Sequence, residues 1–364
     1  MSLPTLPPGC RFQHCRMDAA REHEHDATRD HCTKRTAIDD VADDAGSDED
    51  YPDTWSFMWK HVLEDATRIP AMRFTDEPPD RRLHSAYPRE TLQVFSVEVA
   101  KLRRRKKNKT GGRPNYLHGW PIHVYGMVAV RDCVDRRRNV LFRRDRDECQ
   151  VLTREAPRLE LTGPSRAVVF LDPAFLEVDL RVKGGGTEDD EDDERLSSLE
   201  ARIWAYQPFH STLEFASELS TVRVTLAYLH ESVEATVAVR VDASGGGTWP
   251  PENGRRVRIV AATAGMPGEE VVLLDSGGDG RGHHVPAAAD GGVMLSRRVA
   301  SVEISGELKV SIKAWKLGDD DDRVAQQDEE VFKPKKAGRS YGTLDVGFCQ
   351  MDVTVAWSLI SSSI

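Results

Sequence analysis

The sequence predicts an all-β protein, and two observations support this prediction. Apolar and polar residues alternate strictly at 176–183, 233–241, 308–314 and 351–359, so that one face of each segment is apolar. Such alternation buries one face of a strand and leaves the other in water, as in antiparallel sheets. Turn residues separate the segments, and no useful stretch of helical period follows residue 90. We therefore expect roughly a dozen strands in an antiparallel sandwich of two sheets.

The chain before the β region has a different composition. Residues 1–50 are polar and rich in His, Asp and Arg, which predicts a disordered N-terminal tail. Residues 51–90 combine an apolar stripe of helical spacing at 54–66 with a proline-rich connector. The expected organisation is therefore tail, short amphipathic helix with connector, and a β-sandwich domain over 91–360.

The predicted helix presents Trp55 and Trp59 on one stripe. A free helix of about 13 residues is marginal in water, so it needs a docking surface. Two tryptophans on one face suit the groove of a partner protein. Alternatively, the helix packs on its own β domain and covers an edge strand. The sequence leaves both interpretations open.

Two strands are expected to be irregular. Leu92 and Val94 follow one phase of alternation, whereas the apolar residues from Phe95 to Val99 follow the other. Trp315 likewise breaks the phase of the segment that ends at residue 314. A change of phase inside a strand predicts a β-bulge, since one extra residue turns the following side chains to the opposite face.

Charge is distributed unevenly along the chain. The net charge is −10, but residues 91–150 hold 15 Lys and Arg against 6 Asp and Glu, a local balance of +9 that leaves −19 for the rest. Three charged inserts, at 101–109, 184–195 and 319–322, are expected to be solvated loops. A chain polarised in this way can bind an anionic partner through one face in spite of its negative total.

Two basic segments are the candidate patch for an anionic partner. If 92–100 and 121–131 are neighbouring strands, the loops that follow them meet on one surface. Nearby aromatic residues, Tyr116, Trp120 and Tyr125, suit stacking on bases. A solvated loop, a nuclear import signal and a nucleic-acid groove remain alternative interpretations. The candidate residues are Arg103, Arg104, Arg105, Lys106, Lys107, Arg136, Arg137 and Arg138.

Membrane and secretory classes are not favoured. No apolar run reaches the roughly 18–20 residues that a spanning helix needs, and the N-terminus has no basic segment followed by an apolar one. The six cysteines are scattered, as is usual in reducing compartments. We expect a soluble protein of the cytoplasm or nucleus without a membrane partner.

The sequence predicts no catalytic, cofactor-binding or metal-binding residues. Glu231 and Glu234 lack the nearby Arg of an N-glycosidase, and 275–277 is a single Asp-Ser-Gly where an aspartic protease needs two. The Cys- and His-rich stretch at 10–32 matches no zinc spacing. No nucleophile motif accompanies the loop histidines, which are His118, His123, His283 and His284.

Several long strings resemble one plant family. They include LQVFSVEVA at 92, LTGPSRAVVFLDP at 161, LSRRVASVEISGELKV at 295 and KAGRSYGTLDVGFCQMDVTVAWSL at 336. Together with ATRIPAMRFTD at 66, they are similar to the domain of unknown function 6598 of grasses, over about residues 55–360. The resemblance implies no established activity. Some members are fused to ribosome-inactivating domains, which implies a stress or defence setting.

These observations favour a non-enzymatic β-sandwich module that binds a protein partner through loops at one end. The first alternative is a nucleic-acid-associated protein that uses the basic 101–146 region. The second is a hydrolase or N-glycosidase-related enzyme whose site is not visible in the sequence. No cofactor is expected.

Overall fold

The computed structural model describes residues 66–77, 86–103, 119–171, 173–184, 193–204, 210–217, 219–242, 255–277, 291–316 and 324–361. The chain divides into two units between Trp55 and Ser56, and all described residues belong to the second unit. The predicted tail lies outside the described residues. So do Trp55, Trp59 and the predicted helix except for its last residue, Ala66, which forms an isolated bridge with Arg138 instead of a helical turn.

The described residues form 18 strands and one 3-10 turn, η2 (Arg146–Glu148), so the all-β prediction is confirmed. In chain order the strands are β1 Ala86–Tyr87, β2 Arg89–Leu102, β3 Ile122–Arg131, β4 Asn139–Arg144, β5 Gln150–Leu152, β6 Val168–Val169, β7 Ala174–Val182, β8 Glu194–Ile203, β9 His210–Ala216, β10 Ser220–Val241, β11 Arg255–Thr263, β12 Val271–Asp275, β13 Val299–Glu303, β14 Leu308–Lys316, β15 Val324–Phe332, β16 Ala337–Asp345, β17 Gln350–Ser358 and β18 Ile360–Ser361.

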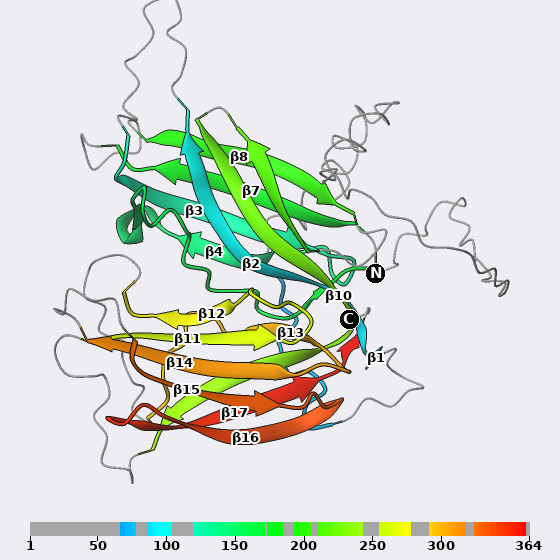
Figure 1. The fold of residues 1–364 in the computed structure, drawn as a ribbon. Helices are drawn as coiled ribbons and strands as arrows, with labels where there is room; N and C mark the ends of the chain where they lie inside the picture. The colour runs from blue at the N-terminus through cyan, green and yellow to red at the C-terminus, as the bar shows by residue number, and fades with distance from the viewer. Residues whose placement is uncertain are drawn as a thin grey trace, which may run out of the picture. The chain divides into compact units, whose positions relative to one another are not determined.

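The named strands pair antiparallel, as predicted, but they form four sheets instead of two. A seven-stranded sheet has the order β16-β17-β10-β2-β6, with β9 and β13 also paired to β10. A five-stranded sheet has the order β4-β3-β7-β8, with β5 on β3. A four-stranded sheet has the order β12-β11-β14-β15, and β1 pairs with β18 (Figure 1).

The predicted single sandwich is therefore replaced by two cores that share one strand. β10 is 22 residues long, or about 70 Å, which is more than one sandwich can cover. Its first half packs with the five-stranded sheet through Val222 and Leu226, and we call this half of the protein the first sandwich and its core the first core. Its second half packs with the four-stranded sheet through Val233 and Val237, which forms the second sandwich and the second core. Figure 1 shows β10 running from one sandwich into the other.

A break in β10 marks the passage between the two cores. Its register against β2 shifts between Leu229 and Ser232, and Glu231 has a φ of 41° there. An extra residue in a strand bends it and turns the following side chains to the other face. The break therefore coincides with the passage of β10 from the first core to the second.

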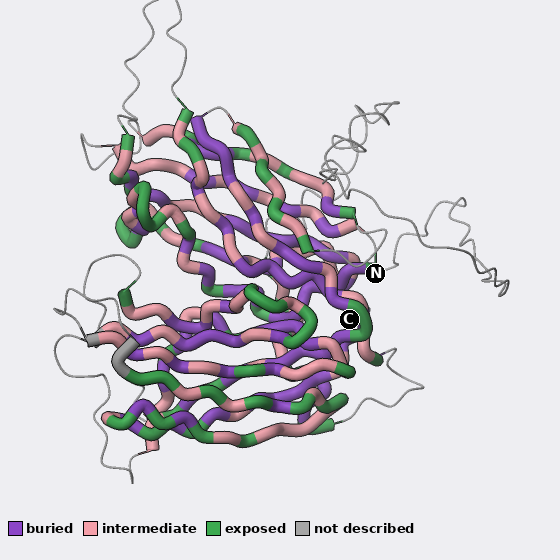
Figure 2. Tube along the Cα trace, in the orientation of Figure 1, coloured by how far each residue is buried: buried purple, intermediate pink, exposed green. Residues whose placement is uncertain are grey.

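Strand alternation and the predicted bulge in β2 are confirmed, whereas the irregularity at Trp315 comes from an extra residue in the neighbouring β15, Ala325. Along β7, buried and half-buried residues alternate from Ala174 to Leu180. Phe95 is the extra residue of β2, because Thr225 pairs with Ser96 and the next residue pairs with Val94. The β14–β15 register also shifts next to Trp315. Figure 2 shows buried residues along β2 and β10, and many exposed ones on β15 and β16.

The segment 66–77 ties both sandwiches together. Thr67 donates a hydrogen bond of 2.6 Å to Asp135, which follows β3 in the first sandwich. The backbone N–H of Phe74 donates to Ser358 Oγ, at the end of β17 in the second, over 3.0 Å. This segment lies before the first long strand and is hydrogen-bonded to both sandwiches.

Candidate functional site

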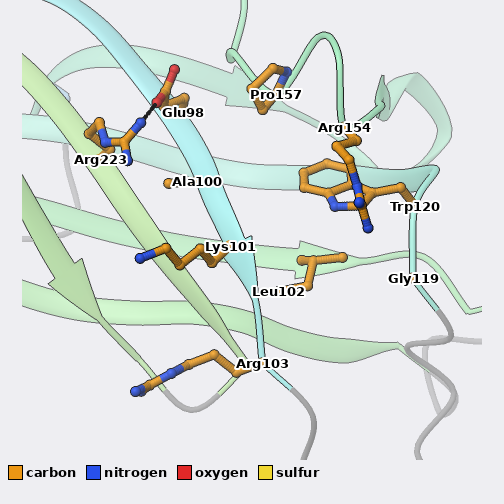
Figure 3. Close-up of a pocket in the computed structure, with 10 residues that line it drawn as sticks. All are labelled: Glu98, Ala100, Lys101, Leu102, Arg103, Gly119, Trp120, Arg154, Pro157 and Arg223. Carbon is orange, nitrogen blue, oxygen red and sulfur yellow. Dashed lines mark hydrogen bonds and ion pairs between the residues drawn. The ribbon is translucent and has the colours of Figure 1, made fainter.

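A groove of about 590 Å³ lies across the end of β2 (Figure 3). We call it the basic groove. Figure 3 shows Lys101, Arg103 and Arg223 on one side of β2, and Trp120 and Arg154 on the other. The residues that line it are Glu98, Ala100, Lys101, Leu102, Arg103, Gly119, Trp120, Arg154, Pro157 and Arg223.

Strand pairing brings these residues together from four separate stretches of chain. β2 pairs with β10 along one edge, which sets Glu98 opposite Arg223. Along its other edge, the N–H of Val99 donates to Pro157 O over 3.0 Å, which fixes the connection that carries Arg154. The groove is thus part of the sheet framework, with side chains projecting from paired backbone.

The described lining is strongly basic. It holds four cations, Lys101, Arg103, Arg154 and Arg223, and one acidic residue, Glu98. Like charges gathered on a concave surface attract anions, and they do so more strongly than the same charges on a flat one. The groove therefore has the electrostatic character of an anion-binding site.

The acidic residue is already bound within the groove. Arg223 donates 2.5 Å to Glu98 and 2.6 Å to Glu214, and Arg158 lies 3.5 Å from the same Glu98 carboxylate. These hydrogen bonds, the one with Glu214 foremost, raise the pKa of the Arg223 guanidinium. Arg223 therefore positions Glu98. The other three cations of the lining, Lys101, Arg103 and Arg154, can interact with a ligand.

Those three cations reach solvent. Lys101, Arg103 and Arg154 are all exposed. Arg103 donates one hydrogen bond to Ser217 O over 3.1 Å, which orients its guanidinium and leaves further N–H groups on it. Exposed lysine and arginine side chains can form charge-assisted hydrogen bonds with a phosphate or carboxylate, so they suit reversible binding of an anion.

Trp120 supplies an aromatic surface beside the cations. Its indole is half-buried, packs against the first core and also lines the groove. The preceding residue, Gly119, has a φ of 127°, a backbone conformation that favours glycine and turns the chain into β3. The tryptophan is thus held by packing on one side and presented to the groove on the other.

The other two predicted stacking residues are not seen in the groove. Tyr116 lies outside the described residues. Tyr125 donates a hydrogen bond of 2.6 Å to Asp193, and burial together with this carboxylate raises its pKa to about 12. Arg146 also donates to Asp193 over 2.7 Å. Asp193 belongs to the predicted acidic insert, but instead of lying in a solvated loop it accepts these two hydrogen bonds from Tyr125 and Arg146.

Of the two predicted basic segments, the structure describes Arg103 of the first and Arg136, Arg137 and Arg138 of the second. Arg103 lies near the start of β3, whereas Arg136, Arg137 and Arg138 follow its end, about 30 Å away along a ten-residue strand. β2 and β3 belong to different sheets, so the condition for one patch is not met. The remaining candidates, Arg104, Arg105, Lys106 and Lys107, lie outside the described residues.

Of the arginines that follow β3, Arg138 is engaged with a carboxylate, in a cluster that we call the arginine junction: Arg131, Arg138, Arg166, Asp132, Asp135 and Glu177. Arg131 and Arg138 both donate to Glu177, over 2.8 and 2.9 Å. Arg166 donates two hydrogen bonds, of 2.6 and 2.9 Å, to Asp132. Burial disfavours the charge of Arg166, but Asp132 outweighs it and raises its pKa.

Buried charge extends from the junction to β10. The carboxylate of Glu234 accepts hydrogen bonds from the N–H groups of Met72 and Ala167, over 2.7 and 2.8 Å. Its complete burial raises its pKa, against the effect of these bonds. Glu234 therefore fastens two loop segments onto β10, which is a structural role.

Other candidates from the sequence have structural contacts. Asp275 accepts two hydrogen bonds from Arg256, and Ser276 accepts one from Val257 N–H, as expected of a turn. Cys149 Sγ lies 3.8 Å from His123 Nδ1, longer than the usual contact of a nucleophile and its base. Among the described residues, no group of three His, Cys, Asp or Glu that could hold a metal is found. His118, His283, His284 and the Cys- and His-rich tract lie outside these residues.

The match to a family model settles which family this is. The model described as "Domain of unknown function (DUF6598)" matches residues 91–355. The chain belongs to this family. The resemblance noted in the strings is thus confirmed, and the DUF6598 region begins within β2 and includes most of both cores. The tying segment 66–77 lies upstream of the matched residues.

Comparisons with individual proteins add little. No curated protein matches. Human GIVD cytosolic phospholipase A2 is 10% identical with a TM-score of 0.22, covering 76% of this chain and 33% of that one. The structure of its complex with methyl gamma-linolenyl fluorophosphonate is 11% identical with a TM-score of 0.23, covering 74% of this chain and 32% of that one. This chain thus spans about a third of that enzyme's length, and the similarity is too low to support an inference. No helix within the described ranges is long and apolar enough to cross a membrane.

Sequence reasoning missed most of the groove. The sequence predicts a charged loop at 101–109, whereas Lys101 ends up in β2, and Arg154 and Arg223 are isolated cations in the chain. Only strand pairing places them beside Arg103 and Trp120. The one available signal was that Arg223 occupies a polar position of an alternating strand, facing outward.

Proposed function

We propose that this DUF6598 protein is a non-enzymatic interaction module whose ligand is anionic and binds in the basic groove. The observation that supports this best is the gathering of four cations around one paired carboxylate in a hollow of about 590 Å³. The hollow is at the end of the first sandwich, where loops leave the strands. This position agrees with a module that binds its partner through one end.

The cytoplasm or nucleus is the compartment that this proposal implies. Cys149 and Cys349 are free thiols, as a reducing compartment would keep them. Anionic polymers, including RNA and acidic proteins, are abundant there.

Heparin chromatography of the full chain tests the proposal. Replacing Lys101 and Arg154 by Gln removes two exposed cations from the groove, so the double variant should elute at lower salt than the parent. The matched control is Lys313→Gln with Arg143→Gln, which makes the same charge change on β14 and β4, outside the groove. Elution of both double variants at the same salt concentration would contradict a groove-centred site.

A further inference from the structure

We infer that the basic groove takes a single-stranded nucleic acid, with a base stacked on Trp120 and phosphates held by Lys101, Arg103 and Arg154. This inference rests on the proposed anionic ligand and names its class. It depends on the way aromatic and cationic groups are divided within the groove.

Cations and the aromatic ring occupy different parts of the groove. Figure 3 shows Lys101 and Arg103 on one side of β2, and Trp120 on the other side with Arg154. A nucleotide has the same division, because its phosphate is anionic and its base is a flat apolar ring. Grooves that bind single strands combine basic tracks with aromatic platforms in this manner.

An acidic peptide would match less of the lining. Its carboxylates would pair with the cations, but the apolar surface of Trp120, Leu102 and Pro157 would contact nothing suited to it. A base can cover that apolar surface while its phosphate stays among the cations. The lining as a whole therefore favours a nucleic acid over an acidic chain.

We infer a single strand, not a duplex, because Trp120 must reach the flat face of a base. In a duplex the bases are stacked on one another, and their faces are not available to a side chain. The indole of Trp120 lies in a hollow of about 590 Å³, the size of a site for one small ligand. It can therefore be covered by an unpaired base but not by the outside of a helix.

The test compares two substitutions of Trp120 in the full chain. Trp120→Phe keeps an aromatic ring, and Trp120→Leu keeps apolar packing against the core without one. Fluorescence anisotropy would measure the binding of a labelled single-stranded oligoribonucleotide, with thermal melts confirming that both variants fold. Trp120→Leu should weaken binding by about 5- to 150-fold, the range for loss of one stacked base, and Trp120→Phe by much less.

Competition separates this inference from the proposed function. Heparin should bind equally to the parent, Trp120→Leu and Trp120→Phe, because it offers no base to stack. A duplex, polyglutamate and a 5′-mononucleotide should each compete less well than the unlabelled single strand. Equal effects of Leu and Phe, or equal competition by any of these three, would overturn the single-strand assignment even where heparin binding persists. Failure of the parent to bind any polyanion would instead overturn the proposed function.

Discussion

At the outer end of β2, Lys101 and Arg154 are exposed and line an open groove. Beyond the other end of β3, the arginine junction encloses its cations: the side chains of Arg131 and Arg166 are each 5% exposed. Each region takes part of its cations from the basic stretch at 91–150, Lys101 and Arg103 in the groove and Arg131 and Arg138 in the junction. The difference lies in the carboxylates, since Glu98 is the one acid of the groove lining, whereas the junction contains three acids for its three arginines.

This contrast shows that a run of arginines does not by itself mark a binding surface. A cation that is buried against a carboxylate has already exchanged its water for a protein partner. Few of its N–H groups therefore remain to bind a ligand. A cation on an open strand end retains its hydration and its free N–H groups. The two regions should therefore respond differently to the same type of substitution.

The largest expected effect is on stability, at the junction. Arg166→Met would leave Asp132 and Asp135 buried without their common partner, and breaking a buried pair costs about 3–5 kcal/mol. Urea unfolding at neutral pH would measure this loss. Arg154→Met in the groove is the matched control, and it should change the free energy of unfolding by less than about 0.5 kcal/mol. Similar losses for both variants would remove the distinction between the regions.

A smaller effect is expected at Glu177, whose side chain is 12% exposed. Glu177→Gln removes the charge that accepts hydrogen bonds from Arg131 and Arg138, at a cost of about 1.5–3 kcal/mol. The exposed Glu329→Gln on β15 is the control and should leave the unfolding midpoint unchanged.

The loss of unfolding free energy caused by Glu177→Gln should also depend on pH. Burial opposes ionisation of Glu177, but the hydrogen bond from Arg138 and the charges of both arginines outweigh it and lower its pKa. Its stabilisation is therefore complete above the unfolded value of about 4.3 and is lost as the pH falls through the lower folded pKa. Unfolding at pH 7 and pH 3 should show the gap between parent and variant narrowing in acid. A gap that stays constant would contradict the ion-pair description.

The sequence predicts local structure well and long-range arrangement poorly, and β10 shows why. Alternation predicts its second half, and the change of phase in 92–99 predicts the bulge at Phe95, because these are properties of neighbouring residues. The division into two cores depends on the break near Glu231 and on which strands pair on each side of it. Neither is encoded in the period of one segment.

The site shows the same limit. Arg103 and Trp120 stood out in the sequence, one by its charged neighbours and the other as an aromatic close to a basic run. Arg223 did not, because it reaches the groove only through the pairing of β2 with β10. The pairing of Arg138 with Glu177 is equally invisible in the sequence, because Glu177 comes from β7.

The salt dependence of oligonucleotide binding tests the central claim most directly. Each phosphate contact with a single strand contributes about 0.7 to the slope of log K against log salt concentration, so Lys101→Gln with Arg154→Gln should reduce its magnitude by about 1.4. The control pair, Lys313→Gln with Arg143→Gln, should leave the slope unchanged. If the groove pair leaves the slope unchanged, or the control pair reduces it equally, the basic groove is not the binding surface.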